Sequence, residues 1–176
     1  MNKTTRRVAV SGMMVALAVA ILRMGGVIPA ATFAGPAAAG LLLIPVFAEG
    51  GQKFALGAWI AVSTLSLILC PDKEAALLFA FLGWYPAMKW RLEARLPGPK
   101  GVPVKLALWN LCAGAMAAMI FYVFRMDQVI AEYREMGRAM LIAFILLANA
   151  TLLVYDRLLG IVAVLYLKKL RPKVFK

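Results

Sequence analysis

Polar side chains inside the apolar stretches of this sequence are the residues whose chemistry has to be explained first. Ser63 and Ser66 lie in one apolar run, Lys73 follows the end of that run, and Asn149 lies in another. Serine hydroxyls in a membrane usually bond back to their own helix, and the alternative is contact with a ligand. For Asn149 the alternatives are an interhelical hydrogen bond or a ligand in an outward-opening pocket. For Lys73 they are solvation or an anionic ligand group.

Catalysis finds no support among the residue types. The chain has no histidine, no G-x-x-x-x-G-K-[ST] loop and no cluster of acidic residues that would hold a divalent metal. Cys70 and Cys112 lack the C-x-x-C spacing of a metal clip or redox pair. We therefore expect no catalytic residue, no metal and no cofactor.

Composition places the polar groups in a membrane. Of 176 residues, 64% are hydrophobic and only 16% are charged, and apolar runs of membrane-spanning length recur along the chain. The net charge of +12 comes from Lys and Arg that cluster beside these runs, so membrane topology explains it better than a nucleic-acid partner does. The sequence predicts an all-α integral membrane protein.

Six transmembrane helices are expected in one domain that covers residues 1–176. Pro45 and Pro86 fall within these segments and should kink them. The predicted helices span residues 8–22, 34–48, 54–69, 75–90, 104–124 and 139–167.

Lys and Arg also predict the orientation. With the N-terminus in the cytoplasm, six crossings return the C-terminus there, and the cytoplasmic segments then hold 14 of the 20 Lys and Arg against 5 outside. Asp156 and Arg157 lie within the last helix, where a structural charge pair is favoured over a functional one.

Two outward segments are distinctive. Residues 23–34 are apolar and rich in Gly, Ala and Pro, so we expect them to fold over the bundle as a lid. Residues 125–138 mix both charge signs, and Val129, Ile130 and Tyr133 predict a short amphipathic helix at the membrane surface. Between the third and fourth helices, Asp72 is expected to cap the helix that follows it.

A stripe of very small residues runs along the first helix. Gly12, Ala16 and Ala20 recur every four residues, which allows another helix to approach closely. From the spacing alone, a helix of the same bundle and a helix of an external partner are equally good candidates.

The sequence VALAVA at 15–20, together with GGVIPAATFAGPAAAGLLLIPV at 25–46, resembles the substrate-binding subunits (S components) of energy-coupling factor (ECF) transporters. The resemblance implies a six-helix bundle in a bacterial plasma membrane, which captures a vitamin-like molecule from outside. It also implies docking of the first helix, through Ala16 and Ala20 extended by Gly12, onto a transmembrane coupling protein that works with two cytoplasmic ATPases.

The predicted ligand is a small, partly apolar organic molecule. Its site is expected to comprise the lid around Val27 and Phe33 together with Ser63, Ser66, Lys73 and Asn149. Three other classes remain open: a stand-alone transporter or channel, which would need a continuous polar path, a non-transporting assembly protein, and a membrane enzyme.

Overall fold

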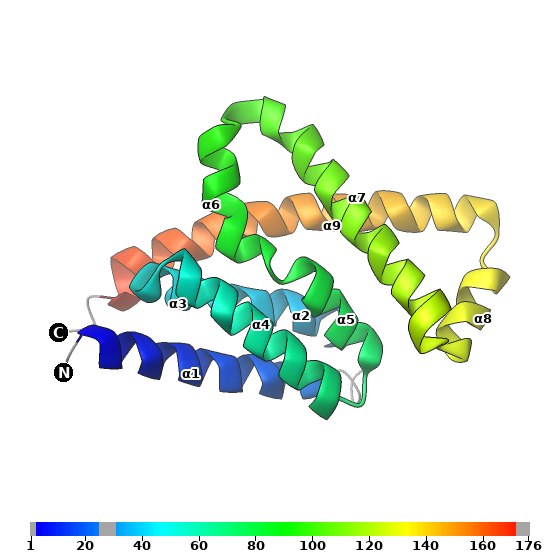
Figure 1. Cartoon of the computed structure of the whole chain (residues 1–176). Coiled ribbons are helices and arrows are strands. Elements are labelled where there is room, and N and C mark those ends of the chain that lie inside the picture. Colours follow the sequence, from blue (N-terminus) through cyan, green and yellow to red (C-terminus); the bar gives the residue numbers. More distant parts are fainter. Residues whose placement is uncertain (1–2, 25–30, 172–176) are drawn as a thin grey trace.

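The computed structural model describes residues 3–24 and 31–171, and these residues form helices with no strand among them (Figure 1). In chain order, the helices are α1 (Lys3–Arg23), α2 (Ala31–Leu41), α3 (Leu43–Gly50), α4 (Gln52–Leu69), α5 (Lys73–Leu82), α6 (Tyr85–Arg95), η2 (Gly98–Lys100), α7 (Gly101–Ala118), η3 (Met119–Phe124), α8 (Asp127–Glu135), α9 (Arg138–Leu165) and η4 (Tyr166–Leu170).

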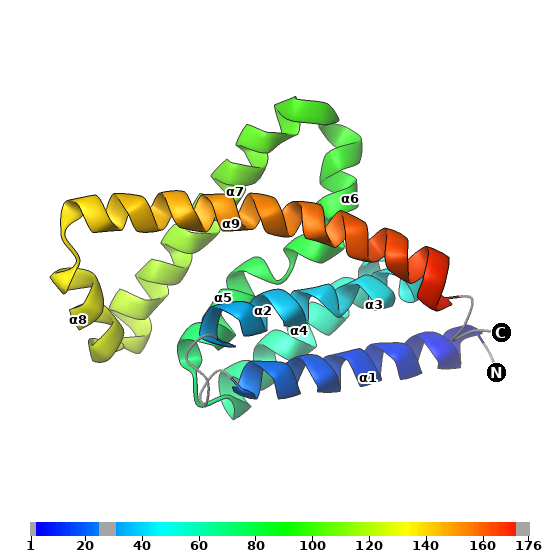
Figure 2. The same ribbon diagram turned by 180° about the vertical axis from the view of Figure 1, so that it is seen from behind.

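The main apolar core lies where α1 packs against α2, α3 and α4. Ala18 and Leu22 of α1 are fully buried there with Val46 of α3 and Val62 of α4. A second cluster joins Tyr85, Trp109 and Leu159, which come from α6, α7 and α9. The first half of the chain therefore forms a packed bundle, and α7 and α9 lie against its side (Figures 1 and 2).

Two of the predicted helices are broken in two. The segment predicted at 34–48 divides at Leu42 into α2 and α3, and the segment predicted at 75–90 divides at Gly83 and Trp84 into α5 and α6. Each break lies two or three residues before a proline, Pro45 or Pro86. Proline lacks an N–H, and its ring clashes with the carbonyl one turn earlier, which interrupts the helix. The sequence predicted kinks at these two prolines, whereas the structure has complete breaks.

A glycine allows α9 to approach α2. The Tyr155 hydroxyl of α9 donates a hydrogen bond to the Ala37 carbonyl of α2 at 3.2 Å. A Cβ atom at Gly40 would collide with this hydroxyl, so the close approach requires glycine at that position.

The chain reverses direction at Arg125, which ends the π-helical segment η3 in the left-handed region (φ 44°). The next helix, α8, confirms the short helix predicted within residues 125–138. Val129, Ile130 and Tyr133 are half-buried on one face of α8, whereas Glu135 on the other side of the helix is exposed. This amphipathic helix covers the junction between η3 and the start of α9.

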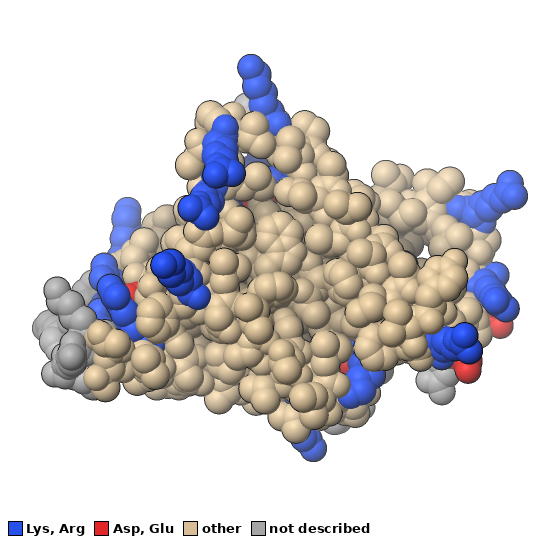
Figure 3. Space-filling view, viewed as in Figure 1, with Lys and Arg blue, Asp and Glu red and all other residues tan. Residues whose placement is uncertain are grey.

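Apolar helices of membrane-spanning length dominate the structure. In the part of the chain that the structure describes, five segments are long and apolar enough to cross a membrane: Thr4–Arg23, Thr32–Gly50, Gln52–Leu69, Gly101–Phe124 and Arg138–Lys169. Lys and Arg gather at the two ends of the molecule and around the α6–α7 connection, whereas the middle of the face in Figure 3 is made of other residues. These features indicate a helical membrane protein.

Candidate functional site

α1 begins and α9 ends at one end of the molecule, which we call the terminal end, and α8 lies at the opposite end (Figures 1 and 2). At this α8 end, four helices enclose a cavity of about 260 Å³, which we call the Glu74–Glu132 cavity. The residues that line it are Thr32 and Phe33 of α2, Glu74 of α5, Glu132 and Tyr133 of α8, Met136, and Phe144 of α9.

Asp72 connects two of these helices. It caps α5, as predicted, by accepting a hydrogen bond from the Ala75 N–H at 3.0 Å. Its other carboxylate oxygen accepts a hydrogen bond from the Thr32 hydroxyl at 2.7 Å. The start of α2 is thereby held beside the start of α5, which brings Phe33 and Glu74 to the same cavity.

Aromatic rings form the opposite wall of the Glu74–Glu132 cavity. The rings of Tyr133 and Phe144 stand nearly perpendicular, with centroids 6.2 Å apart and an interplanar angle of 83°. Phe121 of η3 supports the Tyr133 ring from outside the cavity, at a centroid distance of 6.2 Å. Edge-to-face contacts of this kind fix the orientation of the α8 side chain against α9.

The two carboxylates of the cavity, Glu74 and Glu132, have no cationic partner among the described residues. Burial raises the pKa of Glu74, and the neighbouring charges of Asp72 and Glu132 raise it further. Burial also raises the pKa of Tyr133, with added contributions from Glu74 and Glu132. The cavity is an electronegative site with an aromatic wall.

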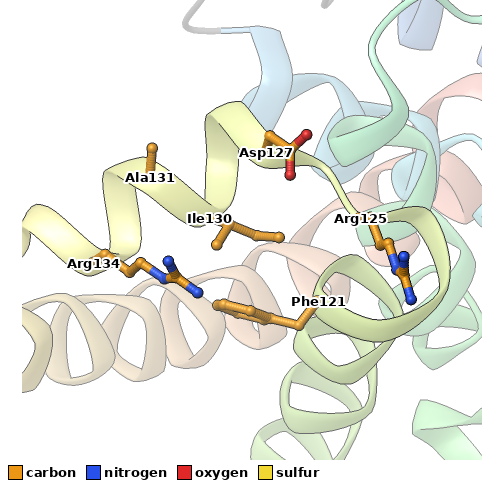
Figure 4. A pocket seen from close by; sticks show the side chains of 6 residues that line it. All are labelled: Phe121, Arg125, Asp127, Ile130, Ala131 and Arg134. Atoms are coloured by element: carbon orange, nitrogen blue, oxygen red, sulfur yellow. The ribbon is translucent and has the colours of Figure 1, made fainter.

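A second cavity, of about 390 Å³, lies between η3 and α8 (Figure 4). Its lining comprises Phe121, Arg125, Asp127, Ile130, Ala131 and Arg134. The Arg134 side chain extends toward the ring of Phe121, and Arg125 stands at the turn that ends η3. This cavity carries two cationic side chains and one carboxylate, so its electrostatic character is opposite to that of the Glu74–Glu132 cavity.

Of the predicted ligand residues, Phe33 lines the Glu74–Glu132 cavity, and 53% of its surface is exposed. Val27 lies outside the described residues. Ser63 and Ser66 are buried in α4 and line neither cavity; the Ser66 hydroxyl donates to the Ser63 carbonyl at 3.1 Å. The Ser63 hydroxyl has no hydrogen-bond partner among the described residues.

Lys73 and Asn149 line neither cavity. The Lys73 ammonium group donates to the carbonyls of Leu67 and Cys70 at 2.8 and 2.9 Å, so it caps the end of α4. The side-chain amide of Asn149 exchanges hydrogen bonds of 2.8 and 3.2 Å with that of Asn110 on α7. For Asn149, this is the interhelical hydrogen bond that the sequence left as one of two alternatives.

The small-residue stripe lies on the surface of α1. Gly12, Ala16 and Ala20 are all exposed, and a Cβ atom built on Gly12 would meet nothing within 4 Å. The opposite face of α1 packs into the core through Ala18 and Leu22. Among the described residues, no helix of the chain covers the stripe.

A buried ion network joins α6, α7 and α9. Asp156 accepts hydrogen bonds from the Tyr85 hydroxyl and the Lys89 ammonium at 2.5 Å each, and from the Lys105 ammonium at 2.8 Å. Both lysines also bond to Glu93, at 2.5 and 2.8 Å. From the sequence, Lys89 and Lys105 contribute only to the predicted membrane orientation, yet these two residues are 4% and 6% exposed in the structure.

A second ion cluster closes the terminal end. The Glu49 side chain, 2% exposed, pairs with Arg6 of α1 and, at 2.9 Å, with Arg171 beyond η4. The Arg7 side chain donates to the Glu49 carbonyl at 2.9 Å. In the buried network, Glu93 and Asp156 pair with Lys89 and Lys105, and at the terminal end Glu49 pairs with Arg6 and Arg171. Each of these three carboxylates therefore has its cationic partners within the protein.

Sequence reasoning missed Glu74, Glu132, Tyr133 and Phe144 as cavity residues. Tyr133 was interpreted only through the amphipathic pattern of α8. The available signal was the set of five acidic residues in the two outward segments that hold the start of α5 and all of α8.

The comparisons with known proteins found nothing similar: no protein-family model, no curated protein and no solved structure matches the chain.

Proposed function

We propose that this protein is the substrate-binding subunit of an ATP-driven importer of the energy-coupling-factor type. It captures a small organic molecule from outside and docks through α1 onto a transmembrane coupling protein that works with two cytoplasmic ATPases. The observation that carries the proposal is the exposure of Gly12, Ala16 and Ala20 on α1. In a membrane, close contact between backbones drives helix association, and a stripe of small residues permits that contact.

The proposed topology has six crossings, with α5 and α6 together forming the fourth, and both termini in the cytoplasm of a bacterial cell. Two observations support it. α1 begins and α9 ends at the same end of the molecule. The Lys and Arg count favours the cytoplasm for that end. The α8 end, with the Glu74–Glu132 cavity, then faces the exterior.

Substrate capture is assigned to this outward cavity. Four helices converge on it, and it combines aromatic rings with a small number of polar groups, as small-molecule sites commonly do. Because the chain has no nucleotide-binding loop of the G-x-x-x-x-G-K-[ST] type, the ATPases of the proposed complex would supply the energy for release.

Affinity capture tests the docking proposal. Tagged protein is purified in mild detergent from its native host, and co-purifying proteins are identified by mass spectrometry. We expect the wild type to recover a transmembrane protein and ATPases, and the variant with Ala16→Leu and Ala20→Leu to lose them, because added side chains hold the helices apart.

The matched control carries Ala143→Leu and Ala150→Leu, the same change at two exposed alanines of α9. It should recover the same partners as the wild type. Failure of folded wild-type protein to recover ATPases would contradict the proposal and favour a stand-alone transporter. Equal recovery by the α1 variant would exclude the stripe as the docking surface.

A further inference from the structure

The acidic residues of this chain divide into two groups. Of the eight, Glu49, Glu93 and Asp156 form ion pairs. The other five lie at the α8 end and form none with described residues: Asp72, Glu74, Asp127, Glu132 and Glu135. Asp72 has structural hydrogen bonds. Asp127, Glu132 and Glu135 are all exposed, but of these three only Glu132 lines the Glu74–Glu132 cavity. Glu74 and Glu132 are the pair that lines the Glu74–Glu132 cavity.

The nearest cation in the sequence does not neutralise this pair. Lys73 precedes Glu74, yet its ammonium group is held by the carbonyls of Leu67 and Cys70 at the end of α4. Arg125 and Arg134 line the cavity on the other side of α8. No lysine or arginine is among the residues that line the Glu74–Glu132 cavity.

Glu74 is a half-buried carboxylate beside two others, and its charged form is unfavourable unless a cation approaches it or it takes up a proton. The aromatic wall offers the same preference by a second mechanism, because the face of an aromatic ring attracts a cation. Phe33, Tyr133 and Phe144 place three rings around the space that Glu74 and Glu132 border. The carboxylates and the aromatic rings therefore both favour a positively charged ligand.

We propose that the Glu74–Glu132 cavity binds a small organic cation, with its ammonium group beside the two carboxylates and its apolar part against the aromatic rings. That this cation is the transported substrate rests on the proposed function above. Its binding to the isolated chain does not. The cavity volume of about 260 Å³ is below the usual range for drug-sized ligands, so it restricts the ligand to a smaller molecule. The sequence allowed Lys73 to pair with an anionic group of the ligand. Here Glu74 and Glu132 would instead pair with a cationic group of the ligand.

Isothermal titration calorimetry on the full chain in detergent tests this proposal with three probes that share a benzyl or phenyl group and differ in charge. These are benzyltrimethylammonium, benzyl alcohol and benzoate. We expect the cation to bind at least about tenfold more tightly than the neutral and anionic probes. Equal affinities, tighter binding of benzoate, or no binding of the cation up to millimolar concentration would each overturn the proposal.

Variants locate the binding site. Glu74→Gln and Glu132→Gln should each weaken binding of the cation about tenfold, whereas Glu135→Gln, at an exposed residue that does not line the cavity, should leave it unchanged. Phe144→Leu, which keeps every charge, should also weaken it. Circular dichroism and size-exclusion profiles confirm that each variant is folded. Unchanged affinity in the folded Gln variants would overturn the proposal.

The two proposals fail separately. Loss of the cation preference would leave partner capture through α1 untouched, because that readout does not depend on ligand charge. Conversely, cation binding without recovery of ATPases would refute the importer and leave the binding site standing.

Discussion

Glu49, Glu93 and Asp156 each have Lys or Arg partners from other helices or from the next turn, whereas Glu74 and Glu132 at the α8 end have no ion pair within the described residues. Both regions hold carboxylates in a largely apolar protein. In the two ion clusters, Lys and Arg side chains of the chain supply the positive counter-charge. At the α8 end, the carboxylates of Glu74 and Glu132 have no such partner among the described residues and can pair with a cationic ligand. Internal pairing of this kind joins helices, whereas unneutralised charge beside a cavity is typical of a site that receives a ligand.

The largest effect is expected where the pairing is most buried. Asp156→Ala would leave Lys89 and Lys105 with Glu93 as their remaining carboxylate and the Tyr85 hydroxyl without its acceptor. Breaking a buried pair leaves an uncompensated charge, so the free energy of unfolding should fall by about 3–5 kcal/mol. Denaturant titration in detergent micelles measures this. Asp127→Ala, an exposed acid at the α8 end, is the matched control and should change it by less than about 0.5 kcal/mol.

Glu49→Gln should have a smaller effect at the terminal end. The Glu49 side chain is buried, but those of Arg6 and Arg171 are 32% and 47% exposed, and solvent weakens the pairs. We expect a loss of about 1–2 kcal/mol in the free energy of unfolding. Hydrogen exchange should rise at residues 163–171, where Arg171 no longer holds the end of α9. Unchanged exchange there would show that Glu49 does not anchor this end.

Acidification should weaken ligand binding at the α8 end. The pKa of Glu74 is raised by burial, Asp72 and Glu132, so Glu74 takes up a proton at a higher pH than an ordinary glutamate. The groups that face it are Asp72, Glu132 and Tyr133. Because benzyltrimethylammonium keeps its charge at every pH, its affinity should fall several-fold between about pH 7 and about pH 5. Calorimetry in that range checks this, and constant or rising affinity would contradict it.

The smallest effect has the opposite sign. Without ligand, Glu74→Gln removes the repulsion among Asp72, Glu74 and Glu132, so the free energy of unfolding should stay the same or rise by a few tenths of a kcal/mol. Thermal unfolding of the ligand-free variant beside Asp156→Ala makes the contrast direct. A loss comparable to that of Asp156→Ala would mean that Glu74 is structural and would remove the difference between the two regions.

Local features were predicted well from the sequence. Hydropathy alone located the helices around residues 8–22, 54–69 and 139–167, and the capping role of Asp72 and the amphipathic pattern of α8 are both confirmed. These features depend on residues within a few turns of one another, so the sequence carries them directly.

The candidate site depends on contacts that the sequence does not record. Phe33 of α2 and Phe144 of α9 line one cavity although they are 111 positions apart, and they do so because α2 packs beside α5 and α9 in the folded chain. Lys89 and Lys105 have the sequence context of solvated cytoplasmic charges, yet they meet Asp156 because α6 and α7 fold back beside α9. The sequence predicted that Lys73 could contact a ligand. Its hydrogen bonds to the carbonyls of Leu67 and Cys70 depend on how the chain turns between α4 and α5, which the sequence pattern does not show.

Hydrogen exchange of the full chain with and without benzyltrimethylammonium shows where the cation binds. We expect protection in peptides that cover the starts of α2, α5 and α9 and all of α8, with no change around Glu49 and Asp156. Protection confined to the terminal end or to the α6–α7–α9 network, or no protection at a saturating concentration of the cation, would contradict it.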